Sequence, residues 1–280
     1  MFASDGSRYL SRRERFVMRL MTSVRKRLQV VVRLSDHGRT ARYVCETPMD
    51  AQRPLSLWIK EAGTMAWIDA EVRPGDVFMD VGANVGIYSI AAALRIGAGG
   101  VVYAFEPHKV NALALMRNVQ ANGLQERIHV FACALSDAEG LLRFNYQTLG
   151  SASSGSQFGH RRLLGVGDDF MPAASEMVYG SRVDALIDNG TIRAPTLVKI
   201  DVDGNELAIL RGMARLLRGD DRPRAVQVEL NVGEHESVSA FMRECGYGLV
   251  TRHDTHEGSQ ARARGEAAEA IAHNAIFAPA

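Results

Sequence analysis

Cysteine is scarce in this chain, and the sequence has no long apolar run and no excess of charge of either sign. Its three cysteines, Cys45, Cys133 and Cys245, are scattered and lack the spacing of metal ligands, so we expect reduced thiols in a cytoplasmic protein. The apolar stretches are strand-sized, too short to span a membrane. Arg19 and Arg25 interrupt any signal-peptide block. A net charge of +1 argues against a nucleic-acid partner.

Hydrophobic residues make up 46% of the 280 residues, which is enough for the core of an α/β domain. We expect a small N-terminal appendage over residues 1–54 and a main domain over residues 55–280. An irregular insertion at about 141–183 interrupts the main domain with glycines, serines and little periodicity. Loops of this length are usually functional or disordered, so one interpretation is that the insertion closes over a bound substrate.

The appendage begins with a basic stretch, residues 11–28, whose apolar residues fall on one side of a helix. This pattern fits a helix packed on the main domain, and it also fits a docking helix for an acidic partner or a lipid surface. Residues 29–34 and 42–46 resemble the two strands of a hairpin. Residues 55–70 are expected to form a helix that leads into the first strand of the main sheet.

Two apolar runs, each ending in an acid, carry the first functional signal. The run over residues 77–81 contains Asp80 and is followed by a turn with Gly82 and Gly86. The second run ends at Glu106, and a helix is expected between the two runs. This order is typical of a nucleoside-binding crevice at the carboxyl edge of a parallel sheet. A carboxylate at Glu106 can accept hydrogen bonds from both ribose hydroxyls, which predicts an adenosine-containing ligand.

The glycine pattern favours one adenosine derivative over another. A dinucleotide fingerprint has a middle glycine, and here Asn84 occupies that position. Asp80 would also repel a pyrophosphate, whereas it suits the cationic amino group and sulfonium of S-adenosylmethionine. We therefore favour S-adenosylmethionine as the cofactor and keep an NAD-linked oxidoreductase as the alternative.

A second acidic segment follows later in the chain, in Lys199-Ile-Asp201-Val-Asp203-Gly-Asn-Glu206. With it, the chain resembles the FkbM family of S-adenosylmethionine-dependent methyltransferases over roughly residues 55–230. Asp203 departs from the family, which usually carries Glu there. The matching segments, in the family's order, are Asp80-Val-Gly-Ala-Asn-Val-Gly86, Phe105-Glu-Pro107, Ala134-Leu-Ser136, Gly150-Ser-Ala-Ser153 and Val198-Lys-Ile-Asp-Val-Asp-Gly-Asn-Glu206.

The resemblance implies an α/β fold of the Rossmann-like methyltransferase type, with a mostly parallel seven-stranded sheet whose last strand is antiparallel. It also implies an O-methyltransferase acting on a hydroxyl of a sugar or secondary metabolite, with a small-molecule or glycan acceptor. A homodimer stays open. Nucleic-acid methylation is a further alternative, but the chain lacks a basic stripe and an Asn/Asp-Pro-Pro-Tyr-like loop. A protein that binds the cofactor without turnover is not excluded either. The expected strands are 77–81, 101–105, 128–132, 197–201, 225–230, 246–251 and 274–278.

The expected site residues fall into two groups. Glu106 would bind the ribose, Asp80 the amino acid end through neighbouring groups, and residues 134–136 the adenine edge. The full cofactor set is Asp80, Gly82, Ala83, Asn84, Gly86, Glu106, Pro107, Asn111, Ala134, Leu135, Ser136 and Asp201. A carboxylate or a histidine would take the acceptor proton, and the candidates are Asp201, Asp203, Glu229 and His235.

Three of these candidates have a second interpretation. Asp201 would form a salt bridge with Lys199, because a buried lysine on a central strand needs a carboxylate partner. Asp203 and Glu206 fit a helix capping box. Asp201, Glu229 and Asn231 form an oxygen-rich trio of the kind that binds magnesium, although we prefer a site without metal.

Overall fold

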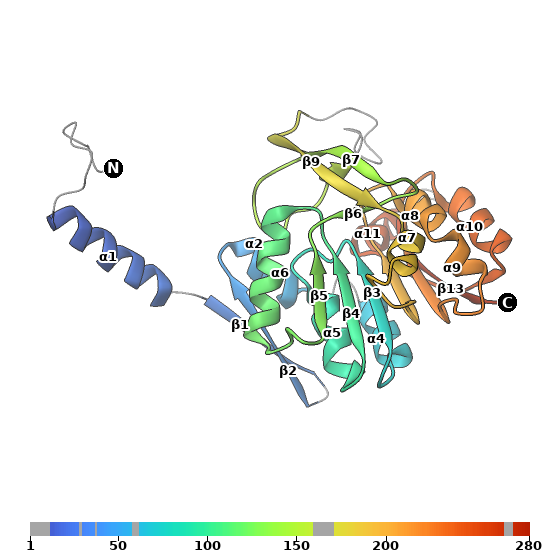
Figure 1. The fold of residues 1–280 in the computed structure, drawn as a ribbon, viewed down its shortest axis with the longest axis horizontal. Helices are drawn as coiled ribbons and strands as arrows, with labels where there is room; N and C mark the ends of the chain where they lie inside the picture. The colour runs from blue at the N-terminus through green and yellow to red at the C-terminus, as the bar shows by residue number, and fades with distance from the viewer. Residues whose placement is uncertain (1–11, 28–29, 37, 58–61, 159–170, 266–270) are drawn as a thin grey trace.

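The structure is a computed structural model that describes residues 12–27, 30–36, 38–57, 62–158, 171–265 and 271–280. Helices and strands alternate over most of the chain, with the main sheet at the centre of the molecule (Figure 1). Its elements are α1 (Arg12–Arg27), β1 (Val30–Asp36), β2 (Arg39–Cys45), α2 (Pro48–Leu55), α4 (Ala62–Glu71), β3 (Val77–Val81), α5 (Ile87–Ile96), β4 (Val101–Phe105), α6 (Lys109–Ala121), β5 (Ile128–Phe131), β6 (Ala134–Leu135), β7 (Gly140–Tyr146), β8 (Gln157–Phe158), β9 (Ala174–Ser181), α7 (Val183–Asp188), β10 (Leu197–Ile200), α8 (Glu206–Gly212), α9 (Ala214–Arg218), β11 (Ala225–Leu230), α10 (His235–Glu244), β12 (Tyr247–Asp254), α11 (His256–Ala263) and β13 (His273–Pro279).

The main sheet has seven strands in the order β12-β13-β11-β10-β3-β4-β5. Strands β11, β10, β3, β4 and β5 pair in parallel, and β13 runs antiparallel to both of its neighbours. This confirms the predicted α/β methyltransferase-type sheet, and each of the seven strands lies within a few residues of its expected position. The carboxyl ends of β3, β4, β5 and β10 meet at one edge, which therefore carries the turns that were predicted to bind a ligand.

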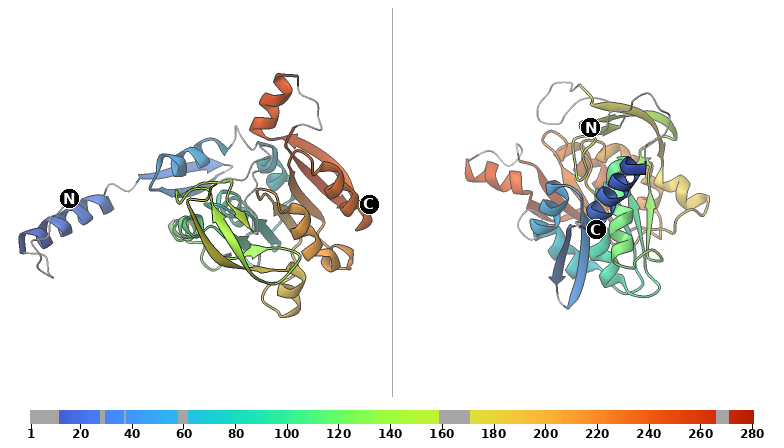
Figure 2. Two further views of the ribbon diagram at one scale, coloured as in Figure 1. Left: turned by 90° about the horizontal axis from the view of Figure 1, so that it is seen from above. Right: turned by 90° about the vertical axis from the view of Figure 1, so that its left-hand side faces the viewer.

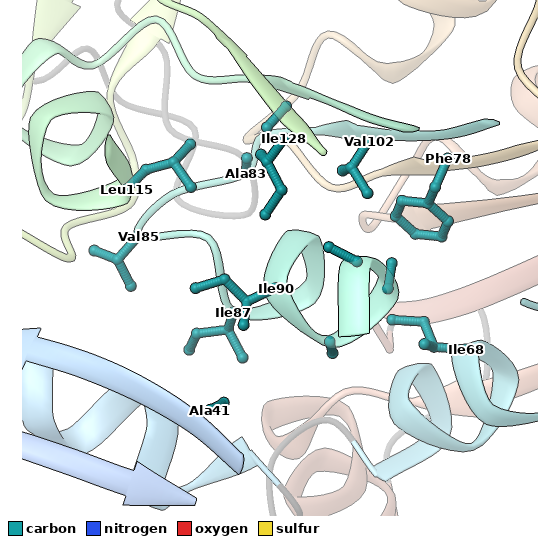
Figure 3. Packing of buried hydrophobic residues seen from close by; sticks show 14 of the residues in the cluster. Ala41, Ile68, Phe78, Ala83, Val85, Ile87, Ile90, Val102, Leu115 and Ile128 are labelled. Atoms are coloured by element: carbon teal, nitrogen blue, oxygen red, sulfur yellow. The ribbon is translucent and has the colours of Figure 1, made fainter. Parts of the chain in front are cut away.

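The sheet is buried on both faces, which is why its central strands are apolar runs rather than alternating patterns. All five residues of β3 are buried. Because side chains alternate along a strand, Phe78 packs in one core cluster and Met79 in the other. Figure 3 shows the first cluster, in which α5 places Ile90 beneath the sheet near Phe78 and Ile68.

The N-terminal hairpin contributes to this same core. Ala41, on β2, faces the cluster beside Ile87 (Figure 3). The side-chain amides of Asn118, on α6, and Asn122, its C-cap, accept hydrogen bonds from the backbone of β2 at 2.7 and 2.8 Å. The hairpin is thus fixed to the catalytic-type domain, and α2 crosses the expected boundary at residues 54 and 55.

The prediction of a single helix over residues 55–70 was wrong, because most of the described residues there belong to two separate helices, α2 and α4. Thr47 and Asp50 form a capping box that starts α2 at Pro48, and the N–H of Ser56 closes the helix on the carbonyl of Gln52. A separate helix, α4, begins at Ala62. Trp58, which was expected on the single helix, lies outside the described residues.

The insertion at about 141–183 is not irregular throughout. Its described residues form three strands which, with β6, make a small sheet in the order β6-β9-β7-β8. Phe144 and Tyr146 of β7 pack with Phe158 and Val178 into a core of its own. The small sheet lies across the carboxyl edge of the main sheet, above β3, β4 and β5 (Figure 1).

Candidate active site

A pocket lies between the carboxyl edge of the main sheet and the small sheet. In this structure its volume is about 50 Å³. Most of its floor comes from the ends of β3, β4 and β10, and most of its cover from β7, β8 and the residue before β8. The lining residues are Val81, Gly82, Phe105, Pro107, Cys133, Ala134, Leu135, Phe144, Ser156, Phe158, Val202, Asp203, Asn205 and Ile209.

The turn after β3 forms one wall of this pocket, and its glycine is required by geometry. Gly82 has a φ of +78°, and a Cβ there would lie 1.9 Å from the carbonyl oxygen of Asp201. The N–H groups of Gly82 and Ala83 both donate to the carbonyl of Phe105, which ties the turn to the end of β4. Asn84 is also left-handed, with a φ of 51°. The turn is therefore held against the ends of both β4 and β10, and only a glycine fits at its first position.

Glu106 follows β4 beside this turn and is almost fully buried. Its two carboxylate oxygens accept hydrogen bonds from the backbone N–H groups of Asn84 at 2.7 Å and His108 at 2.8 Å. Burial raises the pKa of Glu106 to about 7, against the opposing effect of those two donors, and Asp203 and Asp80 add to the rise. The donors hold the carboxyl group in one orientation, and each oxygen keeps a lone pair for a further donor.

Asp80 and Asp201 share one buried cation. Lys199 Nζ lies 3.0 Å from Asp201 Oδ2 and 3.5 Å from Asp80 Oδ1, and it sits 4.6 Å from the centre of the Tyr88 ring. Asp80 is fully buried and also accepts a 2.5 Å hydrogen bond from Ser89. The expected salt bridge of Asp201 is present, and Asp80 lies below the pocket. Asp80 would therefore act on a ligand only through its neighbours.

Asp201 also faces Glu229, at the end of the neighbouring strand. Burial acts to raise the pKa of Asp201, but the Lys199 ammonium, a hydrogen bond with Glu229 and the charge of Arg53 outweigh it and hold that pKa below its usual value. A hydrogen bond between two carboxyl groups needs a proton on one of them. The sequence interpretation missed Arg53, which reaches this region from α2 and donates from Nε to the carbonyl of Ala152 at 3.2 Å.

The capping box expected at residues 203–206 was wrong. Asn205 is the N-cap of α8 and makes no side-chain capping bond. The carboxylate of Asp203 instead accepts a hydrogen bond from the N–H of Gly155 at 2.5 Å. Glu206 is fully buried. Burial is the main cause that raises its pKa well above the usual value, and the negative charge of the nearby Glu234 adds to the rise.

Residues 148–156 lie between β7 and β8, and Ser156 among them lines the pocket; we refer to these residues as the 148–156 loop, which is held from several sides. The carbonyl of Ser153 accepts hydrogen bonds from the side-chain amides of Asn84 at 2.8 Å and Asn111 at 3.0 Å. His108 Nε2 lies 2.9 Å from the carbonyl of Thr148. Asn84 and Asn111, which were both predicted to bind the cofactor, thus hold this loop in place by hydrogen bonds.

The family model described as "Methyltransferase FkbM domain" matches residues 80–249, which is more than half of the chain. The chain belongs to the FkbM methyltransferase family. This confirms the sequence-based assignment, and the protein is a methyltransferase.

Two curated relatives illustrate the family. The chain is 32% identical over 210 residues to the 31-O-demethyl-FK506 methyltransferase FkbM of Streptomyces tacrolimicus, which covers 66% of this chain and 77% of the relative. It is 25% identical over 175 residues to the hexuronic acid methyltransferase AglP of Haloferax volcanii, covering 62% and 64%. A crystal structure of a methyltransferase FkbM from Methylobacillus flagellatus KT aligns with 72% of this chain and 43% of its own, at 16% identity and a TM-score of 0.43.

Some of the predicted residues in this FkbM-family chain do not reach the pocket. His235, at the start of α10, packs its ring against that of His273 at a centroid distance of 4.4 Å. It lines a separate cavity between α10 and β12, because the chain turns away from the sheet edge after β11. Gly86 packs against Leu115, and the N–H of Ser136 donates to the carbonyl of Ser181. We therefore withdraw His235 as the base.

The oxygen-rich trio also has partners of its own. Asp201 is paired with Lys199, and the amide of Asn231 donates to Glu206 at 3.4 Å. Within the described ranges, no group of three or more His, Cys, Asp or Glu side chains is arranged to hold a metal ion. A reaction without metal stays a prediction.

Proposed function

We propose that this protein transfers a methyl group from S-adenosylmethionine to a hydroxyl group of a sugar or secondary metabolite. The observation that carries the proposal is the pocket between the Gly82 turn and the segment around Glu106, in a chain of the FkbM family. One relative is a 31-O-demethyl-FK506 methyltransferase, whose name places the methyl group on an oxygen, and another is a hexuronic acid methyltransferase.

The residues of the pocket suit this cofactor in their chemistry. Phe105, Leu135 and Ile209 line the pocket and offer apolar surface to a base. Glu106 is not in the lining itself but stands between the lining residues Phe105 and Pro107, and its oriented carboxyl would offer acceptors to the two ribose hydroxyls when the cover moves. Gly82 also lines the pocket, and the lack of a Cβ lets its turn lie directly against the Asp201 backbone. S-adenosylmethionine, when bound, supplies an electrophilic methyl group carried on a positively charged sulfur.

The volume requires a movement of the cover. Ligand pockets usually measure roughly 300–1,000 Å³, and this one measures about 50 Å³. Two residues on its upper side are Ser156, the last residue of the 148–156 loop, and Phe158, in the strand β8 that follows the loop. We infer that this segment moves outward when the cofactor enters, and that the bonds to Asp203 and Asn111 re-form over it.

The acceptor would bind next to Asp201. Its side chain is 33% exposed, whereas Lys199 beneath it is 1% exposed, so an incoming hydroxyl can reach the carboxylate but not the ammonium. Asp201 would orient that hydroxyl, and the carboxyl pair with Glu229 would receive its proton. Holding the acceptor oxygen in line with the methyl group provides most of the rate enhancement in such a displacement, and proton transfer to a base increases the rate by roughly a further 10²–10⁴-fold. Arg53 would border the acceptor from α2.

Calorimetry with S-adenosylhomocysteine and with NADH tests the cofactor. Uptake of S-adenosylhomocysteine, and no heat from NADH, is the expected result, and the reverse pattern would refute the proposal. Radiolabelled methyl transfer to a panel of sugars, macrolides, lipids and RNA then tests the acceptor. Label on a hydroxyl compound supports O-methylation. Label confined to RNA, or cofactor binding without any transfer across the panel, contradicts it.

A further inference from the structure

The helix α1 lies apart from the catalytic domain. Figure 1 and the left panel of Figure 2 show it extending beyond the hairpin, away from the main sheet. It precedes the region matched by the family model, which begins at residue 80. Its large apolar side chains are exposed to solvent, with Phe16 at 67%, Leu20 at 53% and Met21 at 58%. The expectation that this helix packs on the main domain is therefore not what the structure shows.

The helix has two chemically different sides. Phe16, Leu20 and Val24 recur every four residues, which places them on one face. The exposed Arg15 and Arg19 are likewise four residues apart, and each lies about 100° around the helix from the apolar residue that follows it, so the two arginines flank the apolar stripe. A helix with this arrangement in water leaves apolar surface unburied, unless another phase or molecule covers it.

This helix has a large excess of positive over negative charge, and the rest of the protein does not. Residues 12–27 contain seven arginine and lysine residues and one glutamate, while the whole chain carries a net charge of only +1. The rest of the chain is therefore net negative. An anionic surface would attract α1 and repel the rest of the chain, which orients the protein on that surface.

We propose that α1 binds the interface of an anionic lipid bilayer. The apolar face would enter the boundary between headgroups and acyl chains, and the arginines would contact the phosphates. In the described part of the chain, no helix is long and apolar enough to cross a membrane. With its apolar side chains at the acyl boundary and its arginines at the headgroups, α1 would lie in the membrane plane.

Two other occupants explain less of the helix. A nucleic acid would satisfy the arginines but leave Phe16, Leu20 and Met21 in water. A second copy of α1 would cover the apolar face, but it would bring two strongly cationic helices together. An anionic bilayer satisfies both sides at once, because its headgroups carry the opposite charge and its acyl chains accept the apolar stripe.

Vesicle flotation of the full chain tests the proposal. The protein should float with vesicles that contain about one-third phosphatidylglycerol in phosphatidylcholine, and not with phosphatidylcholine alone. Its helical circular dichroism should not fall on binding, and added salt should weaken the binding. Replacing Arg15 and Arg19 by alanine should lower the partition coefficient by roughly tenfold or more.

The substitution Leu20→Glu should abolish flotation, whereas Leu141→Glu should leave it unchanged. Leu141 is the matched control, since it is 62% exposed on the small sheet and far from α1 in the sequence. The affinity for S-adenosylhomocysteine and the melting temperature should be the same in both variants, because neither residue lines the pocket or the core.

Several results would overturn the proposal. Equal binding to neutral vesicles, or equal loss in both leucine variants, would remove α1 as an anionic-lipid anchor. Binding to duplex DNA without binding to vesicles would assign the helix to nucleic acid. Light scattering that finds a dimer lost only in Leu20→Glu, together with no flotation of the wild type, would assign it to a second copy. None of these results depends on whether methyl transfer is detected.

Discussion

Asp203 and Gly155 are joined across the top of the pocket, although 48 positions separate them in the sequence: the carboxylate at the end of β10 accepts the loop N–H at 2.5 Å. The same loop is held on its other side by the amides of Asn84 and Asn111. The cover of the pocket is thus fastened at both edges, and each fastening is a polar bond that can break and re-form without disturbing the core.

Replacing Asp203 by alanine should loosen this cover. The bond involves a charged acceptor, so its loss should speed hydrogen exchange at the Gly155 amide by about ten- to hundredfold. Binding of S-adenosylhomocysteine should weaken as well. Exchange measured by mass spectrometry checks the first effect. Asp220→Ala, the same change in an exposed loop, is the control. Unchanged exchange at residues 148–156 would show that Asp203 does not hold the loop.

Glu106 should make cofactor binding depend on pH near neutrality. Burial raises its pKa from 4.5 to about 7, so the folded protein keeps the neutral form to a higher pH than the unfolded chain does. The stabilisation from this proton is complete below a pH of about 4.5 and is lost as the pH rises through about 7. Ribose hydroxyls bind the carboxylate better than the acid. Cofactor affinity should therefore rise as the pH rises through about 7, while the stabilisation from the proton is lost.

Calorimetry at several pH values measures this dependence. The affinity for S-adenosylhomocysteine should fall about tenfold between about pH 8 and pH 6. In Glu106→Gln it should be lower by roughly 1.5–3 kcal/mol at the higher pH, and nearly independent of pH. Glu126→Gln, at an exposed position, should behave as the wild type does. A wild-type affinity that does not vary with pH would remove Glu106 from the ribose site.

The five parallel strands and the acids near their ends could be predicted from the sequence, because a parallel strand buried on both faces must be a short apolar run. The capping box failed because a local pattern competed with a partner far along the chain: Asp203 binds Gly155 instead of its own helix. The small sheet was missed because β7 does not alternate: Leu141 and Leu142 in its first half are exposed, and the last three residues, 144–146, are all buried. His235 was misplaced because the direction of a turn after a strand is set by packing.

The Gly82 turn should tolerate no side chain. Gly82→Ala combines a left-handed backbone with a contact of 1.9 Å to the Asp201 carbonyl. Gly75→Ala isolates the first effect, since Gly75 has a φ of +87° and nothing within 4 Å of its added Cβ. We expect Gly75→Ala to cost about 1–2 kcal/mol of unfolding free energy, and Gly82→Ala roughly 1–3 kcal/mol more. Equal costs in urea denaturation would show that the close approach to β10 is relieved without strain.

Asp201→Asn should reduce turnover more than cofactor binding. The amide can still accept a hydrogen bond, but it cannot take a proton or balance the charge of Lys199, which keeps Asp80 as its other partner. We expect kcat to fall roughly 10²–10⁴-fold, with a much smaller change in the affinity for S-adenosylhomocysteine. Glu229→Gln should give an intermediate loss, because it removes the second carboxyl of the pair.

Single-turnover kinetics with the acceptor found by the radiolabel panel measure this separation, and melting temperatures show whether each variant is folded. The matched control is Asp188→Asn, which changes a carboxylate paired with Arg215 at the surface. The wild-type rate should also survive EDTA, since Asp201 is engaged with a lysine rather than with a metal. Equal losses of binding and turnover in Asp201→Asn would assign Asp201 to the structure of the sheet edge. A rate abolished by EDTA and restored by magnesium would reinstate the trio of Asp201, Glu229 and Asn231.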